Sequence, residues 1–197
     1  MKKIEKMIEQ EKYSSGYEST GPGLKTIQIA KVNSNFEREP LIRPFGFKGG
    51  YVTEIWQTVT SITSSSGIAK IGLGTQSVLW SDAKVFSSHS QSGGDTLMYA
   101  MTEWALQAIK GQSFTSPVQL LEDVLPEVYV YGKKVTSNQQ LRMTFALNAL
   151  VGVDNAIWLL YAVENGFRTF DEMLPKAYRL ALSHHHKKAA AIPLMSY

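Results

Sequence analysis

The sequence contains no cysteine among its 197 residues. That absence excludes disulfide bonds, thiolate nucleophiles and cysteine metal sites. An excess of charge of one sign is also missing, because 20 Lys and Arg residues against 17 Asp and Glu residues leave a net charge of only +3. These charges are interspersed along the chain rather than clustered, so we expect no nucleic-acid-binding surface.

Long apolar runs are missing as well. Glu5 and Glu9 interrupt the N-terminal segment, which therefore lacks the apolar stretch of a secretory signal. The most apolar region, residues 145–163, contains Asp154 and two Asn residues, and we interpret it as a buried helix rather than a membrane span. The 44% of hydrophobic residues suffice for a core. We therefore expect a soluble, cytoplasmic protein without a membrane partner.

The first third of the chain has the alternating apolar pattern of strands. Residues 51–63 are rich in β-branched and aromatic side chains, and a Ser/Gly turn joins them to the next apolar segment. Two strands joined by such a turn pair antiparallel. Residues 33–50 contain Pro40, Pro44 and three glycines, so we predict a loop there. The predicted strands are residues 24–32, 51–63 and 68–74.

The remainder has helical periodicity and helix-end signals. Gly94 and Asp95 precede one apolar pattern, and Ser116 and Pro117 open another, which Pro126 is expected to end. The predicted helices are residues 96–110, 117–125, a long helix beginning at Ser137 or Asn138 and ending at Asn165, and residues 171–182. Strands followed by helices predict an α+β fold, with a three-stranded antiparallel sheet followed by a helical bundle.

Three segments, taken in order, have a familiar arrangement. Residues 40–47 (PLIRPFGF) precede the long strand, the Ser/Gly turn and residues 71–74 (IGLG); residues 153–160 (VDNAIWLL) follow, and the chain closes on residues 191–197 (AIPLMSY). Together they resemble the N-terminal capping domain of the enolase superfamily, in its mandelate racemase and muconate-lactonising group. Many members have an acidic residue after the aromatic one of the helix motif, where this chain has Leu159.

The resemblance implies a domain plan and a chemistry. Residues 1–23 end in a Gly-Pro-Gly stop and form a polar lead. The resemblance implies a capping domain over residues 24–183, and a linker with the start of a first barrel strand over residues 184–197. Such enzymes are racemases, epimerases, cycloisomerases or dehydratases that abstract a proton α to a carboxylate, with Mg²⁺ stabilising the product anion. Their bases and metal ligands lie in a following barrel of about 250 residues. We therefore assign no catalytic residue and no metal ligand here, and we expect this chain alone to be inactive.

In the resembling family, two loops of the capping domain close over the substrate. They correspond here to residues 33–50 and to residues 75–80. A small carboxylate substrate needs a cationic partner, and an enclosed reaction site needs apolar walls. The candidate substrate-binding residues are Arg43, Phe45, Phe47, Lys48, Gln76 and Trp80. In the alternative interpretation, the aromatic residues cover the edge of the sheet and the basic residues are solvated.

Other patterns have simpler explanations. His184, His185 and His186 are consecutive, so their side chains cannot converge on one metal from a helix, and we interpret them as a solvated linker. The glycines of residues 72–74 lack the strand-to-helix context of a phosphate loop. Two functions stay open: a capping domain of a Mg²⁺-dependent isomerase or lyase, or a stand-alone, non-catalytic binding module of the same fold. The chain could form a homo-oligomer in either case.

Overall fold

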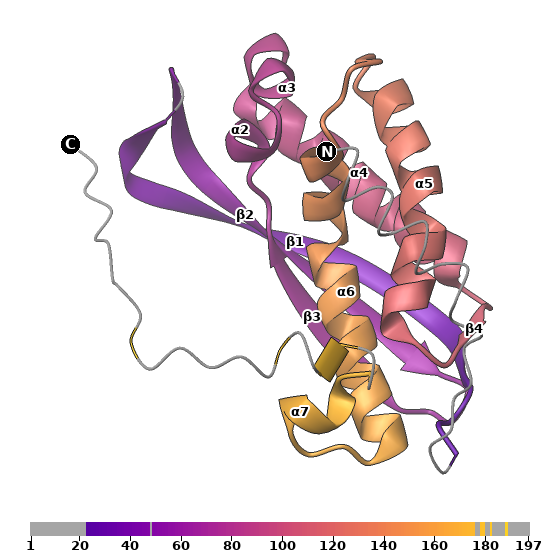
Figure 1. Ribbon diagram of the computed structural model, residues 1–197. Coiled ribbons are helices and arrows are strands. Elements are labelled where there is room, and N and C mark those ends of the chain that lie inside the picture. Colours follow the sequence, from indigo (N-terminus) through magenta and orange to yellow (C-terminus); the bar gives the residue numbers. More distant parts are fainter. Residues whose placement is uncertain (1–22, 48, 176–177, 180–181, 183–187, 189–197) are drawn as a thin grey trace.

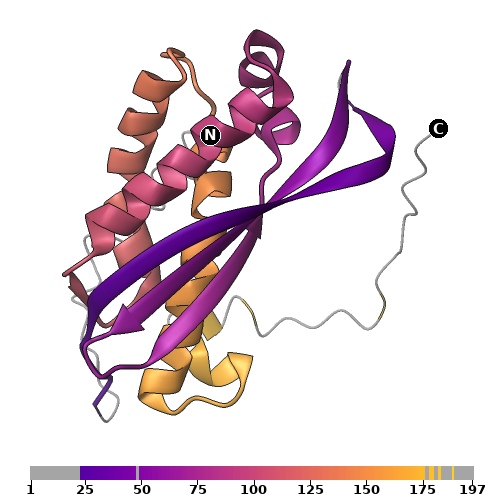
Figure 2. The same cartoon turned by 180° about the vertical axis from the view of Figure 1, so that it is seen from behind.

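The computed structural model describes residues 23–47, 49–175, 178–179, 182 and 188. The fold has two layers, with an antiparallel sheet on one side and helices on the other (Figures 1 and 2). Helices α4 and α6 pack on the sheet, and α5 packs against both of them. The elements are β1 (Ile27–Phe47), β2 (Gly50–Ser64), β3 (Ala69–Thr75), α2 (Val78–Ser81), α3 (Ala83–Ser88), α4 (Gln91–Ile109), β4 (Ser113–Phe114), α5 (Pro117–Val135), α6 (Met143–Asn165) and α7 (Phe170–Met173).

The α+β architecture is as predicted, but the sheet has four strands in the order β3-β2-β1-β4 rather than three. The additional strand, β4, is two residues long and pairs with Ile27 and Gln28 at the start of β1. A strand this short has no periodicity of its own, so its sequence does not reveal it. It joins the end of α4 to α5 and adds Phe114 to the core.

The predicted loop over residues 33–50 is wrong. β1 continues to Phe47 and forms a long antiparallel hairpin with β2, in which Asn33 to Pro40 pair with Ser61 to Glu54. The register then shifts, because Pro40 pairs with Glu54 but the next pair is Phe45 with Val52. Residues 41–44 therefore form a bulge. Prolines lack a backbone N–H and are tolerated in strands at such irregular positions, so Pro40 and Pro44 distort the strand without ending it.

The close approach of α6 to β3 explains the glycines of the IGLG segment. A Cβ atom on Gly72 would lie 2.0 Å from the carbonyl oxygen of Gly152, and one on Gly74 would lie 2.7 Å from the Gly152 nitrogen. The buried Thr60 hydroxyl donates to the Gly152 carbonyl at 2.8 Å. Helix and strand backbones are thus in direct contact, and only glycine leaves the room for it.

Two asparagines of α6 bind the free edge of β3. Asn155 Nδ2 donates to the Leu73 carbonyl at 2.8 Å, and Asn148 Nδ2 donates to the Thr75 carbonyl at 3.0 Å. Asn148 also accepts the Ser77 N–H. These side chains satisfy backbone groups that an edge strand otherwise leaves unpaired.

Several predicted helix ends are shifted. α4 begins at Gln91, five residues early, because Ser90 is its N-cap and accepts from the Gly93 N–H. α5 starts behind Ser116 as predicted but runs through Pro126 to Val135. Pro126 is exposed, so water can satisfy the carbonyl that the missing N–H leaves unpaired.

The end of α6 at Gly166 is as predicted, and that glycine has a φ of 74°. Its start is Met143 rather than residue 137 or 138, because α5 continues to Val135 and Ser137 has a φ of 50°. α6 is long and apolar enough to cross a bilayer by length and composition, and half of its most apolar window is buried in the fold. Of the predicted last helix, residues 171–173 lie in α7 (Phe170–Met173), residues 174 and 175 are not helical, and residues 178, 179 and 182 are helical. The other residues of that helix, with residues 184–186, lie outside the described residues.

Candidate functional site

A cleft of about 970 Å³ lies between the outer half of the β1–β2 hairpin and the segment from β3 to the start of α4. The hairpin extends past the helices, and α2 and α3 face it across this space (Figure 1). The wall is mainly apolar, with side chains from the hairpin on one side and from α2 and α3 on the other. The apolar lining residues are Pro40, Leu41, Ile42, Phe45, Phe47, Val52, Ile55, Val78, Leu79, Trp80 and Phe86.

The bulge in β1 gives the hairpin side of the cleft its shape. Leu41, Ile42 and Arg43 belong to the unpaired residues 41–44 and all line the cleft. Ile42 is fully exposed, and Arg43 is also exposed. In the described part of the chain, Arg43 forms no ion pair. A cationic side chain on the lining of an apolar cleft can bind a carboxylate group through charge-assisted hydrogen bonds.

Three aromatic rings stack in a row, two from β1 of the hairpin and one from α2. Phe45 stacks on Phe47 with ring centroids 6.3 Å apart, and Phe47 stacks on Trp80 with centroids 5.0 Å apart. The pairing of Phe47 with Trp80 connects the hairpin tip to α2. Because Trp80 remains 60% exposed, this aromatic ladder presents a large apolar surface to the cleft.

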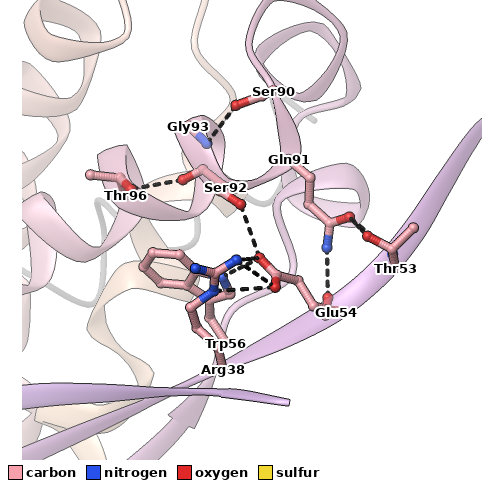
Figure 3. A network of polar contacts seen from close by, with 9 residues as sticks. All are labelled: Arg38, Thr53, Glu54, Trp56, Ser90, Gln91, Ser92, Gly93 and Thr96. Atoms are coloured by element: carbon pink, nitrogen blue, oxygen red, sulfur yellow. Dashed lines mark hydrogen bonds and ion pairs between the residues drawn. The ribbon is translucent and has the colours of Figure 1, made fainter. Parts of the chain in front are cut away.

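A polar network attaches the hairpin to the start of α4 (Figure 3). The Glu54 carboxylate accepts from Arg38 Nη2 at 2.8 Å, from Trp56 Nε1 at 2.9 Å and from the Ser92 hydroxyl at 2.9 Å. Gln91 donates to the Glu54 backbone carbonyl at 2.6 Å. The hydrogen bond from Arg38, followed by that from Trp56, lowers the pKa of Glu54 despite partial desolvation. Glu54 is therefore a charged anchor for the hairpin.

Asp95 lies in α4 and also lines the cleft. Its side chain is 4% exposed, and its Oδ2 atom has no hydrogen-bond partner among the described residues. Burial, and secondarily the negative charge of Glu54, raises the pKa of Asp95 to about 7. A buried carboxyl without a partner is unusual, because such groups are nearly always hydrogen-bonded. The helix cap predicted at Gly94 and Asp95 is wrong, and this frees the Asp95 side chain from a capping role.

Five of the six predicted substrate-binding residues line this one cleft: Arg43, Phe45, Phe47, Gln76 and Trp80. Lys48 lies outside the described residues. Gln76 is buried, and its amide lies 3.1 Å from the Thr58 hydroxyl. With its oxygen toward Thr58 and the Tyr99 N–H, its nitrogen donates to the Asp95 carbonyl at 2.8 Å. Its polar atoms are thus engaged within the fold, whereas the aromatic residues and Arg43 face the cleft.

Sequence reasoning missed Asp95, Glu54 and Arg38. The Arg38–Glu54 pair becomes visible only when residues 33–40 are assigned to a strand, since the two then lie in neighbouring positions on paired strands. Asp95 has no sequence signal apart from an acidic residue in an apolar helix pattern. In the described part of the chain, no group of three His, Asp or Glu side chains converges on a possible metal position. The described residues therefore do not fit a Mg²⁺ site of their own.

Comparison with known proteins gives structural likenesses only. No protein-family model and no curated protein matches the sequence. Solved structures similar to this chain include a dipeptide epimerase from Enterococcus faecalis V583, complexed with Mg and the dipeptide L-Leu-L-Tyr (17% identity, TM-score 0.43, 70% of this chain and 32% of that one). An L-talarate/galactarate dehydratase from Salmonella typhimurium LT2, liganded with Mg and L-lyxarohydroxamate, is also similar (16% identity, TM-score 0.47, 78% of this chain and 35% of that one).

A third similar structure is the L-talarate dehydratase from Polaromonas sp. JS666, complexed with Mg and L-glucarate (18% identity, TM-score 0.46, 71% of this chain and 33% of that one). The structures found are enolase-superfamily enzymes, the family that the sequence resembles. The chain spans about a third of the length of each of them.

Proposed function

We propose that this chain is the substrate-covering, specificity-determining domain of a Mg²⁺-dependent enzyme of the enolase superfamily. The reaction is proton abstraction α to a carboxylate, in a racemase, epimerase, cycloisomerase or dehydratase. The base and the metal ligands belong to a barrel domain outside these 197 residues. The observation that carries the proposal is the open apolar cleft between the hairpin and α2, which gathers aromatic walls and one cation but no catalytic set among the described residues.

In this proposal each side of the cleft has a task. The Phe45–Phe47–Trp80 ladder excludes water from the reacting carbon, since proton transfer at carbon is favoured in a site that excludes solvent. Arg43, on the bulge, binds a distal carboxylate of the substrate and orients it. Glu54 and Arg38 hold the hairpin against α4 so that the walls keep their spacing.

An apolar stripe on α6 supports the presence of a further domain. Every fourth residue of α6 from position 143 to position 163 is apolar except Asn155. The five exposed apolar residues are Met143, Leu147, Val151, Leu159 and Val163. Each is between 38% and 47% exposed. Soluble monomers rarely expose large apolar surfaces, whereas a domain separated from its neighbour does. We propose that the rest of the same protein covers this stripe.

The test is α-proton exchange in D₂O with a panel of carboxylic acids, measured by NMR with and without Mg²⁺. We expect no exchange with the 197-residue chain alone, and Mg²⁺-dependent exchange with the protein encoded by the whole reading frame. There, Trp80→Ala should raise KM about tenfold with a smaller change in kcat, because the residue binds but does not react.

Trp104→Ala is the matched control, since Trp104 is also an exposed aromatic residue but stacks on Tyr131 away from the cleft. It should leave KM unchanged. A stop codon directly after codon 197, with no barrel encoded nearby, would contradict the proposal. A monodisperse chain that binds no hydrophobic dye would point instead to the stand-alone binding module.

A further inference from the structure

The carboxyl of Asp95, on the lining of the cleft, has an unpartnered oxygen. Its Oδ2 atom is buried without a hydrogen bond from any described residue. The nearby polar side chains donate hydrogen bonds elsewhere: Gln76 to the α4 backbone, Gln91 to the Glu54 carbonyl, and Ser92 to the Glu54 carboxylate. Since buried polar groups in folded proteins are almost always paired, the missing donor is expected from outside this set.

The charge around Asp95 favours a cationic donor. Glu54 raises the pKa of Asp95, so its charge disfavours ionisation there, and the more distant positive charge of Arg38 compensates less. Arg38 donates to both carboxylate oxygens of Glu54, and it makes no hydrogen bond to Asp95 Oδ2. A bound cation would stabilise the ionised form of Asp95 and offset this repulsion, whereas a bound anion would add to it.

The rest of the cleft limits the ligand further. Most of the cleft lining consists of aliphatic and aromatic side chains such as Leu79, Val52 and Phe86, which suit an apolar body. Arg43, on the bulge, suits a carboxylate. We infer that the cleft binds a carboxylic acid with an apolar body that also carries a protonated amine, and that Asp95 accepts the N–H of that amine. This inference names the substrate class of the proposed function and rests on it.

The experiment measures binding of matched probes to the 197-residue chain by NMR titration. 3-Phenylpropylamine and 3-phenylpropan-1-ol share one apolar body and differ in the terminal group, which is cationic in the amine and neutral in the alcohol. We expect the amine to bind at least about tenfold more tightly than the alcohol, because a hydrogen bond to a charged partner is stronger than a neutral one. The comparison uses the unmodified chain, so it does not depend on how any variant folds.

Variants then assign the preference to one residue. Asp95→Asn should reduce the preference for the amine to less than about threefold, since the amide keeps the shape but cannot carry the negative charge. Asp154→Asn is the matched control, because Asp154 is another acid whose pKa burial raises, yet it lines a separate groove between α5 and α6. It should leave the preference unchanged.

Equal binding of amine and alcohol, or an Asp95→Asn variant that keeps the preference, would overturn the inference. Loss of the preference in Asp154→Asn as well would also overturn it, since the effect would then be one of overall charge. These outcomes are separate from the α-proton exchange of the full-length protein. If that exchange is found but the amine has no advantage, the proposed function stands and only the substrate class is wrong.

Discussion

Substituting Gly72 by Ala tests the helix–strand contact that holds α6 on the sheet. At an ordinary strand position, Ala is more favourable than Gly by about 0.5–1 kcal/mol. Here the new Cβ would lie 2.0 Å from the Gly152 oxygen and 2.4 Å from the Ala156 nitrogen. Cβ atoms essentially never come closer than 3.0 Å to such atoms, so helix and strand must separate by about 1 Å.

That separation affects more than the one contact. The Thr60 hydroxyl donates to both the Gly152 and Gly72 carbonyls, and Asn155 donates to the Leu73 carbonyl. The bonds that involve Gly152 and Asn155 of α6 cross the gap and lengthen with it, whereas the bond from Thr60 to the Gly72 carbonyl stays within the sheet, between β2 and β3. Overpacking of a core costs about 1–3 kcal/mol when side chains can adjust, and rigid backbone on both sides moves the cost to the upper end. We expect Gly72→Ala to lower the free energy of unfolding by about 3 kcal/mol or more.

Two neighbouring glycines provide a graded control. A Cβ on Gly74 would lie 2.7 Å from the Gly152 nitrogen, a smaller overlap, so Gly74→Ala should cost about 1–2 kcal/mol. A Cβ on Gly152 would meet the Thr60 methyl group at 3.2 Å, which a small side-chain shift relieves. Because Ala is also favoured over Gly in a helix by about 1 kcal/mol, Gly152→Ala should change stability by less than about 1 kcal/mol.

The assay is urea denaturation followed by circular dichroism, with the slope of the transition checked for each variant. The expected order of destabilisation is Gly72→Ala, then Gly74→Ala, then Gly152→Ala. A Gly72→Ala protein as stable as the parent, or the reverse order, would show that α6 does not pack on β3 at backbone distance.

Two further predictions use the same assay at several pH values. Asp95 keeps its proton up to about pH 7 in the folded state but only to about pH 4 when unfolded, so it makes stability fall as the pH rises between these values. The stability of the Asp95→Asn variant relative to the parent protein should therefore increase by about 1–3 kcal/mol from pH 4 to pH 8. A stability difference that does not change with pH would refute the raised pKa of Asp95. Glu164 accepts hydrogen bonds from Ser64 and Ser66, which lower its pKa, so its contribution is present above pH 4.5 and is lost as the pH falls through the folded pKa. Glu164→Gln should cost about 1–2 kcal/mol at pH 7 and progressively less in acid, and a cost that persists at low pH would contradict this.

The elements that the sequence predicts well are those with local signals. β2 and β3 follow from alternation and a Ser/Gly turn, the start of α5 from Ser116 and Pro117, and the end of α6 from Gly166. Two of the errors concern prolines. Pro40 and Pro126 were interpreted as interruptions, yet the first lies in a paired strand beside a bulge and the second on the exposed side of a helix. Whether a proline ends an element depends on tertiary surroundings that local sequence does not contain.

The residues of the cleft also differ in how far the local sequence predicts them. The aromatic residues and Arg43 were selected by chemical type, and the structure gathers them around one cleft. Asp95 was missed because its significance depends on burial and on the absence of a partner, both of which are properties of the packed fold. The role of Gly72 depends on Gly152, which is distant in the sequence, so no local pattern predicts that contact.

The outer end of the long hairpin is attached to the start of α4 at Glu54 and can rotate about that point. One end of the hairpin extends beyond the helical layer (Figure 2). From Glu54 to Gly50, where β2 begins, the strand covers about 13–15 Å at the usual rise per residue. A rotation of the hairpin by about 10° at Glu54 would therefore displace Gly50 by about 2–3 Å, enough to separate Phe47 from Trp80. The position of the aromatic ladder therefore depends on the attachment of Glu54 to Arg38 and Ser92 as well as on the contact of Phe47 with Trp80.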